Sequence, residues 1–494
     1  MRLRWALAAA LAAGVLHTAA FAPTFLWWLQ ILALARLFAL AWEAAPRRAA
    51  ALGAAFGIGW LASGLWWLYI SMHDFGGIPS VLSALAVLLL AAFLCLYYAA
   101  ALAMAARLGG RWKALVFAAS WLLAELARAS WLSGFPWLAS GYAHSVGPLA
   151  AWAPWIGVYG LTALAAAAAA GVAALAMRRD WKPLAGVIAV VVVGQLLPHE
   201  FTASTGRLRV SLLQPNVPQD EKFDRSLIEA NLEKLARQIE SARGQLVVTP
   251  ESVVPLPLEF LDPVYIERLK HAAAQRPLLL GTFLGNEREG YVNSMLAFGT
   301  AEPYDYGKRH LLPFGEFVPW GLHWFVDAMG IPMEDQARGR TQHALPLAGQ
   351  RLRPLICYED LFGEDFVSSM VGPDAATVLV NTSNLAWFGR WMVQDQHLQF
   401  SQMRALEFQR PFIRSTNTGA TAVLDYQGRV TARLDPMVSG VLEAEVEGRS
   451  GSTPYARWLA ACGLWPLWAL AIVVLGLAGW RAGRRTAWRA GWRQ

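Results

Sequence analysis

Carboxylates are scarce in the first 200 residues of the chain. Only five occur there, namely Glu43, Asp74, Glu125, Asp180 and Glu200. Soluble domains carry charge at about a quarter of their positions, so this scarcity excludes an ordinary soluble fold for the region. Across all 494 residues the hydrophobic fraction is 56% and the mean hydropathy is +0.35, whereas residues 206–450 have an ordinary charged composition. The chain therefore contains two regions suited to two different solvents.

Cysteine is scarce as well. Two of the three cysteines, Cys95 and Cys462, lie in apolar runs, so Cys357 is the only cysteine of the charged region. That region cannot form an internal disulfide. A lone thiol in an oxidising compartment is a liability unless it performs chemistry or is packed deep in a core.

Apolar runs of about 20 residues recur through the first region, which is the length of a helix that crosses a hydrocarbon core of about 30 Å. Together with one isolated run near the C-terminus they predict eight spans, near 5–21, 24–44, 51–72, 80–106, 113–130, 150–177, 183–198 and 459–480. We therefore expect a polytopic α-helical membrane domain at 1–198. An extramembrane domain would follow at 199–450, then a transmembrane helix with a basic tail at 451–494.

Lysine and arginine are missing from every second connection between these runs. The loops at 73–79 and 131–149 contain neither residue, whereas the alternate connections are basic: Arg2 and Arg4; Arg47 and Arg48; Arg107, Arg111 and Lys113; Arg178, Arg179 and Lys182; and Arg481, Arg484, Arg485, Arg489 and Arg493. Basic loops are retained in the cytoplasm. Both termini are therefore predicted to be cytoplasmic and residues 199–458 extracytoplasmic. The net charge of +7 follows from this topology, and without a basic cluster on the soluble domain we expect no nucleic-acid partner.

Two features of the apolar region allow two interpretations. Residues 1–22 could be a cleaved signal peptide, but the run leads straight into another span, which favours retention. Glu125 and Arg128 could pair with each other at helical spacing or contact a lipid headgroup.

From Leu208 onward, short β-rich runs alternate with amphipathic helical stretches, which predicts a layered α/β domain. Helices are expected near 225–242, 261–274 and 393–409, and a hairpin turn at Gln427-Gly428. The predicted strands are 208–214, 245–251, 277–283, 294–299, 353–359 and 376–384.

Polar residues stand where these strands end. Glu251 ends one strand, Cys357 ends another, and Lys308 and Glu316 share the segment between them. Strand ends of an α/β sheet converge on one crevice. There a carboxylate can accept the proton of a thiol, and an ammonium can stabilise an oxyanion. We expect Glu251 as base, Lys308 as stabiliser and Cys357 as nucleophile of acyl transfer through a thioester. Taken singly, Glu251 could instead be a turn cap, Lys308 a surface charge and Cys357 a core thiol.

Several segments carry a family resemblance. TPES (249–252), KRHLLPFGEFVP (308–319), ICYED (356–360) and NTSNLAWFG (381–389) resemble the carbon-nitrogen hydrolase, or nitrilase, superfamily with its Glu, Lys and Cys triad. Other segments resemble the membrane-bound branch of this superfamily, the apolipoprotein N-acyltransferase family. They are FAP (21–23), SGFPWLASGY (133–142), the helical segment 403–419 and TPYAR (453–457).

The resemblance implies an αββα sandwich and an activity. Such enzymes of the bacterial inner membrane move an acyl chain from a phospholipid, typically phosphatidylethanolamine, to the amine of the diacylglyceryl-cysteine of an apolipoprotein. No metal or cofactor is implied, and nothing in the sequence indicates a dimer. By motif, the resemblance carries the triad roles to Glu251, Lys308 and Cys357 and marks Glu316 as a further essential carboxylate. The supporting or site-lining positions are Glu359, Tyr358, Trp387, Phe388, Asn293 and Phe223.

The chain departs from the family pattern at two positions. Leu385 stands where an Asp is expected, and Phe223 where a Trp is common. Both leave pocket shape and acyl-chain preference open.

Tryptophan-rich segments at 318–333 and 385–393 are unusual for a soluble domain. We interpret them as mobile arms that enter the headgroup region, where Trp is favoured; packing against the domain is the alternative. Their large aromatic residues are Trp320, Trp324, Phe325, Trp387, Phe388 and Trp391.

Two other functions compete. A membrane-tethered amidase would need only one anchor rather than seven preceding spans. A noncatalytic lipid-binding or transport protein is disfavoured by the intact trio and by the lack of paired charges along several spans.

Overall fold

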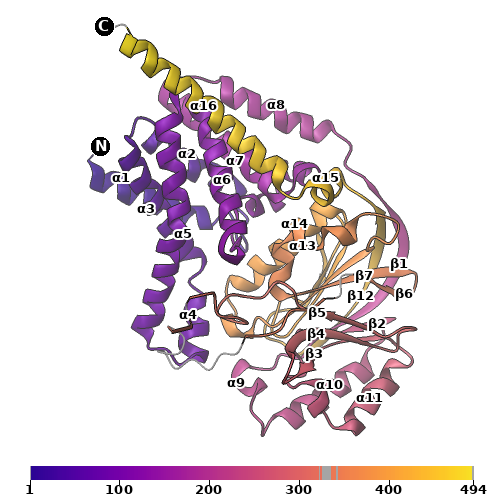
Figure 1. Ribbon diagram of the computed structural model, residues 1–494. Helices are drawn as coiled ribbons and strands as arrows, with labels where there is room; N and C mark the ends of the chain where they lie inside the picture. The colour runs from indigo at the N-terminus through magenta and orange to yellow at the C-terminus, as the bar shows by residue number, and fades with distance from the viewer. Residues whose placement is uncertain (1, 322, 325–334, 341–342, 492–494) are drawn as a thin grey trace. The chain divides into compact units, whose positions relative to one another are not determined.

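The computed structural model describes residues 2–321, 323–324, 335–340 and 343–491. The chain forms two compact units (Figure 1). The helical unit comprises Met1–Tyr69, Ile78–His199 and Ala461–Gln494, and the sheet unit comprises Ile70–Gly77 and Glu200–Ala460. Each unit is described on its own.

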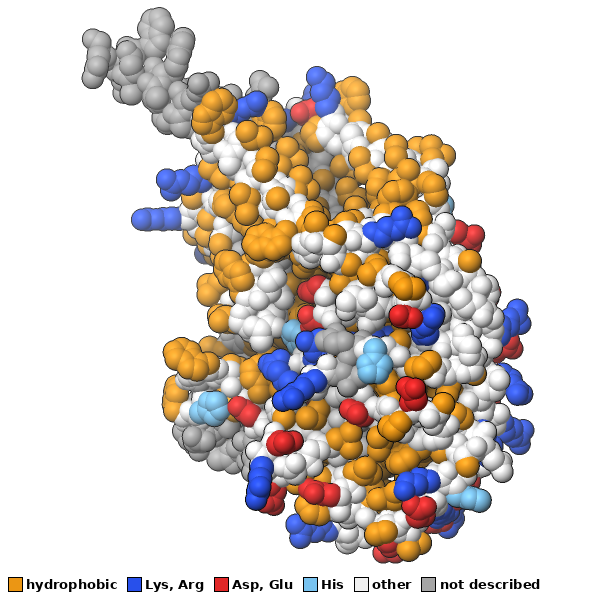
Figure 2. Space-filling model, turned by 45° about the vertical axis from the view of Figure 1, so that its right-hand side comes forward, with side chains coloured by type: hydrophobic (Ala, Val, Ile, Leu, Met, Phe, Trp, Pro, Cys, Tyr) orange, Lys and Arg blue, Asp and Glu red, His pale blue; other side chains and the backbone are white. Residues whose placement is uncertain are grey.

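Apolar helices occur in the helical unit at each place where the sequence predicts a span. They are α1 (Leu3–Thr18), α2 (Trp27–Ala41), α3 (Pro46–Gly64), α5 (Ser80–Leu108), α6 (Lys113–Ser130), α7 (Ala153–Arg178), α8 (Lys182–Leu196) and α16 (Trp465–Gly491). Figure 2 shows hydrophobic side chains over much of the surface of this unit, as expected for helices in contact with lipid.

Not every one of these helices has the length of a span. Among the described residues, four segments are long and apolar enough to cross a membrane: Ser80–Leu108, Lys113–Ser133, Pro148–Arg178 and Trp465–Ala482. A bent pair of helices would make a fifth, and α1, α2 and α8 have only 15 or 16 residues. The structure thus supports four to five candidate spans, and the count of eight stays a prediction.

The bent pair falls within the run predicted as one span at 51–72. Helix α3 ends at Gly64, and the chain continues through α4 (Leu68–Ile70) and the π-helical turn η1 (Ser71–Phe75) at an angle of 62°. The break follows a Ser-Gly pair, and the Ser63 hydroxyl donates back to the carbonyl oxygen of Gly59 at 2.7 Å. Such pairs are common sites of helix kinks, so the run predicted as a span at 51–72 is a bent pair of helices and gives the fifth candidate span.

The predicted C-terminal span is also interrupted. A short helix, α15 (Pro454–Cys462), precedes α16, and Gly463 between them has a left-handed φ of +57°. Cys462 therefore ends α15 and is exposed rather than lying within a continuous span.

Glu125 and Arg128 form a fully buried ion pair in α6. The guanidinium donates to Glu125 Oε2 at 2.9 Å and to two backbone carbonyl oxygens of the loop that follows the helix. Tyr98 and Ser140 both donate to Glu125 Oε1 at 2.9 Å. The pair therefore joins α5, α6 and this loop, which supports the structural interpretation over a headgroup contact.

Breaking this pair tests its structural role. Glu125→Leu leaves a buried cation without a counter-ion, which costs about 3–5 kcal/mol. We expect a clear fall in the unfolding temperature of the detergent-solubilised protein, measured by tryptophan fluorescence. Glu125→Leu/Arg128→Leu should recover much of the loss because no charge is left unpaired. Equal losses in the single and double variants would contradict the assignment.

The sheet unit contains two six-stranded sheets. The first has the order β12 (Gly440–Gly451), β1 (Thr202–Gln214), β2 (Leu246–Val248), β3 (Leu278–Asn286), β4 (Gly290–Phe298), β5 (Tyr304–Gly307). The second has the order β11 (Val430–Arg433), β10 (Ala422–Leu424), β9 (Phe412–Thr416), β8 (Val378–Ser383), β7 (Gln350–Ile356), β6 (Leu345–Leu347). Strands β1, β2 and β3 are parallel, as are β7, β8 and β9.

Helices cover the outer faces of both sheets. Figure 1 shows α10 (Ile228–Ser241) and α11 (Pro263–Ala273) on one side, and α13 (Gly363–Phe366) and α14 (Val393–Phe408) on the other. One apolar core joins the sheets through residues such as Val210 and Val380, and a second lies between the first sheet and α10 and α11. This four-layer arrangement confirms the predicted layered α/β domain.

The helix expected over 403–419 is wrong in its second half. Helix α14 ends at Phe408, and Phe412–Thr416 forms β9 in the middle of the second sheet. Pro411 has no N–H for a helical bond, and β-branched Ile413 favours a strand, which explains the change.

Candidate active site

Glu251 lies in a turn just beyond the end of the parallel strand β2. Its Oε1 accepts from Asn293 Nδ2 at 2.7 Å and from Lys308 Nζ at 3.2 Å, and its Oε2 accepts from the backbone N–H of Asn384 at 2.8 Å. The side chain is buried. Three donors from β4 and from the segments after β5 and β8 therefore fix this carboxylate in one orientation.

Lys308 follows β5 and is only 1% exposed. Its ammonium bridges two carboxylates, Glu251 Oε1 at 3.2 Å and Glu316 Oε1 at 2.8 Å. Asn293 supports the same group, because its carbonyl accepts from the Lys308 N–H at 2.8 Å and its side chain donates to both carboxylates. Glu316 also closes its own loop by accepting from the Leu312 N–H at 2.8 Å.

Cys357 begins a tight turn at the end of β7. Its φ is +52°, a left-handed conformation that is uncommon for a residue with a side chain and marks a strained position. Asn381 of the neighbouring strand β8 donates to the Cys357 carbonyl oxygen at 3.0 Å. Cys357 is partly buried and packs against the apolar core between the sheets.

The charges around Cys357 determine its resting state. Burial raises the pKa of the Cys357 thiol well above its usual range, Glu251 raises this pKa further, and the Lys308 ammonium opposes both. Burial alone would lower the pKa of Lys308, but Glu251 and Glu316 raise it well above its usual range. The resting site thus holds a neutral thiol beside a permanent cation, and the thiol needs a base when it reacts.

Glu359 holds the backbone of the site. Glu359 Oε1 accepts from the N–H groups of Arg309 and His310, and Oε2 accepts from Tyr306 Oη and the Ile356 N–H. The carboxylate therefore ties the segment after Lys308 to the strand before Cys357. Tyr358 is buried. These bonds make Glu359 a positioning residue for both segments, and its expected place in the lining of the site stays a prediction.

Asp360 anchors the other side of the Cys357 turn. Its Oδ2 accepts from Arg414 Nη1 at 2.9 Å and from Ser401 Oγ at 2.7 Å, and all three side chains are fully buried. Burial raises the pKa of Asp360 to about 6, although the Arg414 guanidinium opposes the shift. This network connects the turn to β9 and α14, which the sequence did not indicate.

Lys222 is a second buried ammonium that sequence reasoning missed. It ends α9 (Gln219–Lys222) and donates to Ser252 Oγ at 2.8 Å and to the Glu251 carbonyl oxygen at 3.4 Å. Burial lowers the pKa of Lys222 to about 8, and the charges of Glu251 and Cys357 oppose the shift. A lysine inside the charged segment QDEKFD is typical of a surface position, so composition gave no signal.

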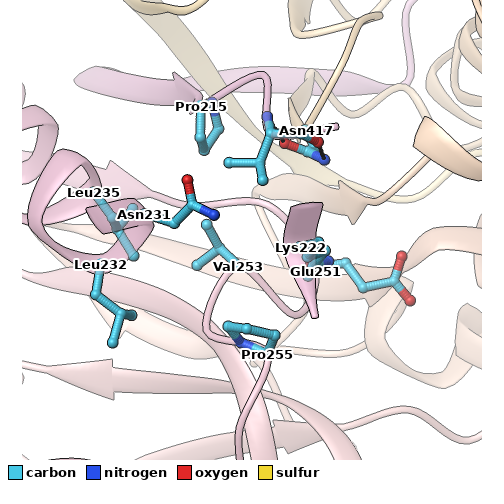
Figure 3. A pocket seen from close by; sticks show the side chains of 10 residues that line it. Pro215, Lys222, Asn231, Leu232, Leu235, Glu251, Val253, Pro255 and Asn417 are labelled. Atoms are coloured by element: carbon cyan, nitrogen blue, oxygen red, sulfur yellow. Dashed lines mark hydrogen bonds between the residues drawn. The ribbon is translucent and has the colours of Figure 1, made fainter. Parts of the chain in front are cut away.

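A small cavity lies behind the Glu251 turn. Figure 3 shows Pro215, Leu232, Leu235, Val253 and Pro255 around it, and the Glu251 carboxylate pointing away from it. With about 10 Å³ of space it has room for roughly one water molecule. This cavity is thus part of the packing that supports Glu251 and is too small for a lipid or peptide.

The remaining predicted positions are the aromatic residues Phe223, Trp387 and Phe388. Phe223 is largely exposed, with the Lys222 ammonium 5.7 Å from its ring centroid. The Trp387 ring makes an edge contact with Phe75 of η1 at 6.0 Å. Phe388, which follows it in the short helix η9 (Ala386–Phe388), is half-buried. The structure therefore brings Asn293 and Glu316 to Glu251 and Lys308, and the expected roles of the three aromatic residues stay predictions.

Comparison with known proteins finds two family models. Residues 13–171 match the apolipoprotein N-acyltransferase N-terminal domain, and residues 209–455 match carbon-nitrogen hydrolase.

Curated relatives match along most of the chain. An apolipoprotein N-acyltransferase of Ralstonia nicotianae is 45% identical over 92% of this chain and 90% of its own length. One of Verminephrobacter eiseniae is 45% identical over 94% of both, and one of Nitrosomonas europaea is 39% identical over 92% of this chain and 93% of its own length.

The pH profile tests the role of Lys222. Since its pKa is about 8, the ammonium is charged at neutral pH and is lost as the pH rises through 8, which removes a cation beside Glu251 and Cys357. We expect the turnover rate to fall over that range. Lys222→Met should be about 10-fold slower at pH 7 and should lack this alkaline decline.

Lys222→Arg provides the matched control because it keeps the charge at high pH. It should retain activity at neutral pH and show no decline near pH 8. An unchanged alkaline decline in Lys222→Met, in protein with an unaltered unfolding temperature, would contradict the assignment.

Proposed function

The chain belongs to the apolipoprotein N-acyltransferase family of the carbon-nitrogen hydrolase superfamily, and on this premise we propose that Cys357 carries the acyl group as a thioester between two lipid substrates. The chain is thus an acyltransferase of lipoprotein maturation. The proposal concerns its residues, its donor and its placement in the membrane.

One observation supports the triad roles above the others. The Lys308 ammonium is held between Glu251 and Glu316, at 3.2 and 2.8 Å, and both Glu251 and Lys308 act electrostatically on the Cys357 thiol. A base, a fixed cation and a nucleophile are thus in one buried cluster. Acyl transfer without a metal requires these three groups.

In the first half-reaction the Cys357 sulfur attacks an ester carbonyl of the phospholipid. Glu251 accepts the thiol proton as the C–S bond forms, and the Lys308 ammonium stabilises the negative oxygen of the tetrahedral intermediate. When the C–O bond breaks, the leaving alkoxide takes the proton from Glu251. The products are a lysophospholipid and the acyl-thioester; we propose phosphatidylethanolamine as the donor.

In the second half-reaction the neutral amine of the diacylglyceryl-cysteine attacks the thioester. Glu251 takes a proton from the amine nitrogen and returns it to the departing Cys357 sulfur. The C–N bond that forms is an amide, more stable than the thioester that breaks, so the step proceeds without a nucleotide or cofactor. The free thiol and the neutral starting cluster are restored.

We place the domains in the membrane as the charge pattern predicts. Eight spans at 1–198 and 451–494 would keep both termini in the cytoplasm of a bacterium and set residues 199–450 on the outer face of the inner membrane. Four to five candidate spans and three shorter apolar helices support this placement. Both substrates are lipids, so a monomer embedded in the bilayer can reach them.

Exposed tryptophans support a contact of the sheet unit with lipid. Trp320 is 98% exposed and Trp324 67%, and Trp391 is also exposed; Phe325 lies outside the described residues. Indole side chains favour the headgroup region of a bilayer. We propose that the segments carrying them contact lipid beside the site.

Trapping the acyl-enzyme tests the chemistry. The purified protein is incubated with acyl-labelled phosphatidylethanolamine, and the peptide containing Cys357 is analysed by mass spectrometry. We expect one acyl adduct on Cys357, discharged when a diacylated lipopeptide is added, and no adduct in Cys357→Ala. Absence of an adduct in an active preparation would disprove the mechanism, and discharge by water alone would favour an amidase-type hydrolase.

Replacing the two exposed tryptophans tests the lipid contact. Trp320→Ser/Trp324→Ser should lower turnover of phospholipid in a bilayer by about 10-fold or more, as expected for two lost interfacial anchors, while a short-chain soluble ester reacts at the normal rate. The unfolding temperature should not change, because both side chains are exposed. The lipid contact would be rejected if the variant retained, relative to the native protein, the same fraction of activity on bilayer phospholipid as on the soluble ester.

A further inference from the structure

A polar cavity in the sheet unit is not used by the proposed mechanism. Its volume is about 260 Å³, close to the lower end of the range for small-ligand pockets of about 300 Å³ and above. The lining includes Tyr306, Arg309, His310, Arg338 and Arg353. The described residues that line it include none of the triad, although Arg309 directly follows Lys308.

Three guanidinium groups line this cavity without a carboxylate partner. Arg309, Arg338 and Arg353 form no ion pair with any residue that the structure describes. Arg338 is held by a bond to the Arg309 carbonyl oxygen at 2.7 Å, and Arg353 donates to the Pro354 carbonyl oxygen at 3.1 Å. These bonds fix the positions of the two cations but do not neutralise their charge.

Arg353 is the most unusual of the three. It is only 1% exposed, and its Cζ lies 4.6 Å from the centroid of the Tyr306 ring. Its Nε has no hydrogen-bond partner in the described part of the chain. A buried, unpaired cation is costly unless a counter-charge approaches it. The side chain therefore requires an acceptor that these residues do not supply.

The two carboxylates that line the cavity are already engaged. Glu359 accepts four hydrogen bonds, three of them from backbone N–H groups. Asp365 Oδ2 contacts His310 Nδ1 at 2.7 Å. Because three arginines line the cavity and both carboxylates are already bonded, the cavity has a positive potential. Arg338 and Asp365 are exposed, so solvent can reach it.

We propose that this cavity is a second, noncatalytic site that binds a phosphate group through Arg309, Arg338 and Arg353. Guanidinium groups bind tetrahedral phosphate oxygens through paired N–H donors, which matches the chemistry of the lining. The group can come from a phospholipid headgroup or from free phosphate. The site is independent of the assignment of Cys357 as nucleophile.

Binding of phosphate at this site would affect the position of the Lys308 ammonium. The backbone N–H groups of Arg309 and His310 are both bonded to Glu359 Oε1, and Lys308 precedes them. A phosphate on Arg309 would restrain the segment that positions the Lys308 ammonium. Binding at the site would thus stabilise the active geometry rather than take part in the reaction.

Phosphate titration of the full-length protein tests the site. In detergent and a phosphate-free buffer, inorganic phosphate is added against sodium chloride of equal ionic strength, and binding is followed by calorimetry. We expect saturable binding, weakened about 10-fold or more in Arg309→Gln/Arg338→Gln because two charge-assisted contacts are lost. The double variant avoids the buried Arg353, whose loss could unfold the protein.

A matched control and a lipid arm complete the test. Arg351→Gln/Arg429→Gln removes the same charge outside the cavity and should bind phosphate normally. In micelles of a phosphate-free neutral detergent, added phosphatidylglycerol should compete with phosphate if a headgroup is the natural occupant, and should not if free phosphate is. No saturable binding, or equal weakening in both double variants, would overturn the proposal.

Discussion

The site depends on one ammonium shared by two carboxylates. Lys308 Nζ lies 3.2 Å from Glu251 and 2.8 Å from Glu316 in a buried cluster, where an unpaired charge of either sign would be costly. The ammonium fixes the Glu251 carboxylate beside the thiol, and Glu316 holds the ammonium where it can stabilise a negative oxygen. Asn293 donates to both carboxylates, so the cluster is set before a substrate arrives.

The fold delivers the nucleophile to this cluster under strain. Cys357 has a left-handed φ of +52°, and the surrounding structure has to hold that conformation against its cost of about 1–3 kcal/mol. Asn381 binds the Cys357 carbonyl oxygen, Glu359 ties the preceding strand to the segment after Lys308, and Asp360 is anchored by Arg414. The two sheets of the sandwich thus meet at this turn, one supplying Glu251 and Lys308 and the other Cys357.

Much of this arrangement could be predicted from the sequence, since strand ends and residue chemistry are local signals. Glu251, Lys308 and Cys357 each follow a strand, and the core strands lie close to their predicted ranges. Lys222, Asp360 and Asn384 were missed because their roles depend on burial and on partners 29 to 133 residues away. The kink after Gly64 was missed because the length of the apolar run outweighed the Ser63-Gly64 signal. Strand β9 was missed because helical periodicity outweighed Pro411. The proposed membrane placement rests on the charge pattern and on four to five candidate spans, because α1, α2 and α8 are shorter than a full span.

The reactivity of Cys357 with iodoacetamide, measured against pH, tests the central claim most directly. In full-length protein with Cys95→Ala and Cys462→Ala, alkylation of Cys357 reports the thiolate fraction. A neutral resting thiol held beside a base and a shared ammonium predicts slow alkylation through neutral pH, with a rise only above the ordinary thiol pKa of about 8.5. A thiolate plateau that is reached below pH 7 would contradict the account, because the nucleophile would then be ionised before Glu251 acts.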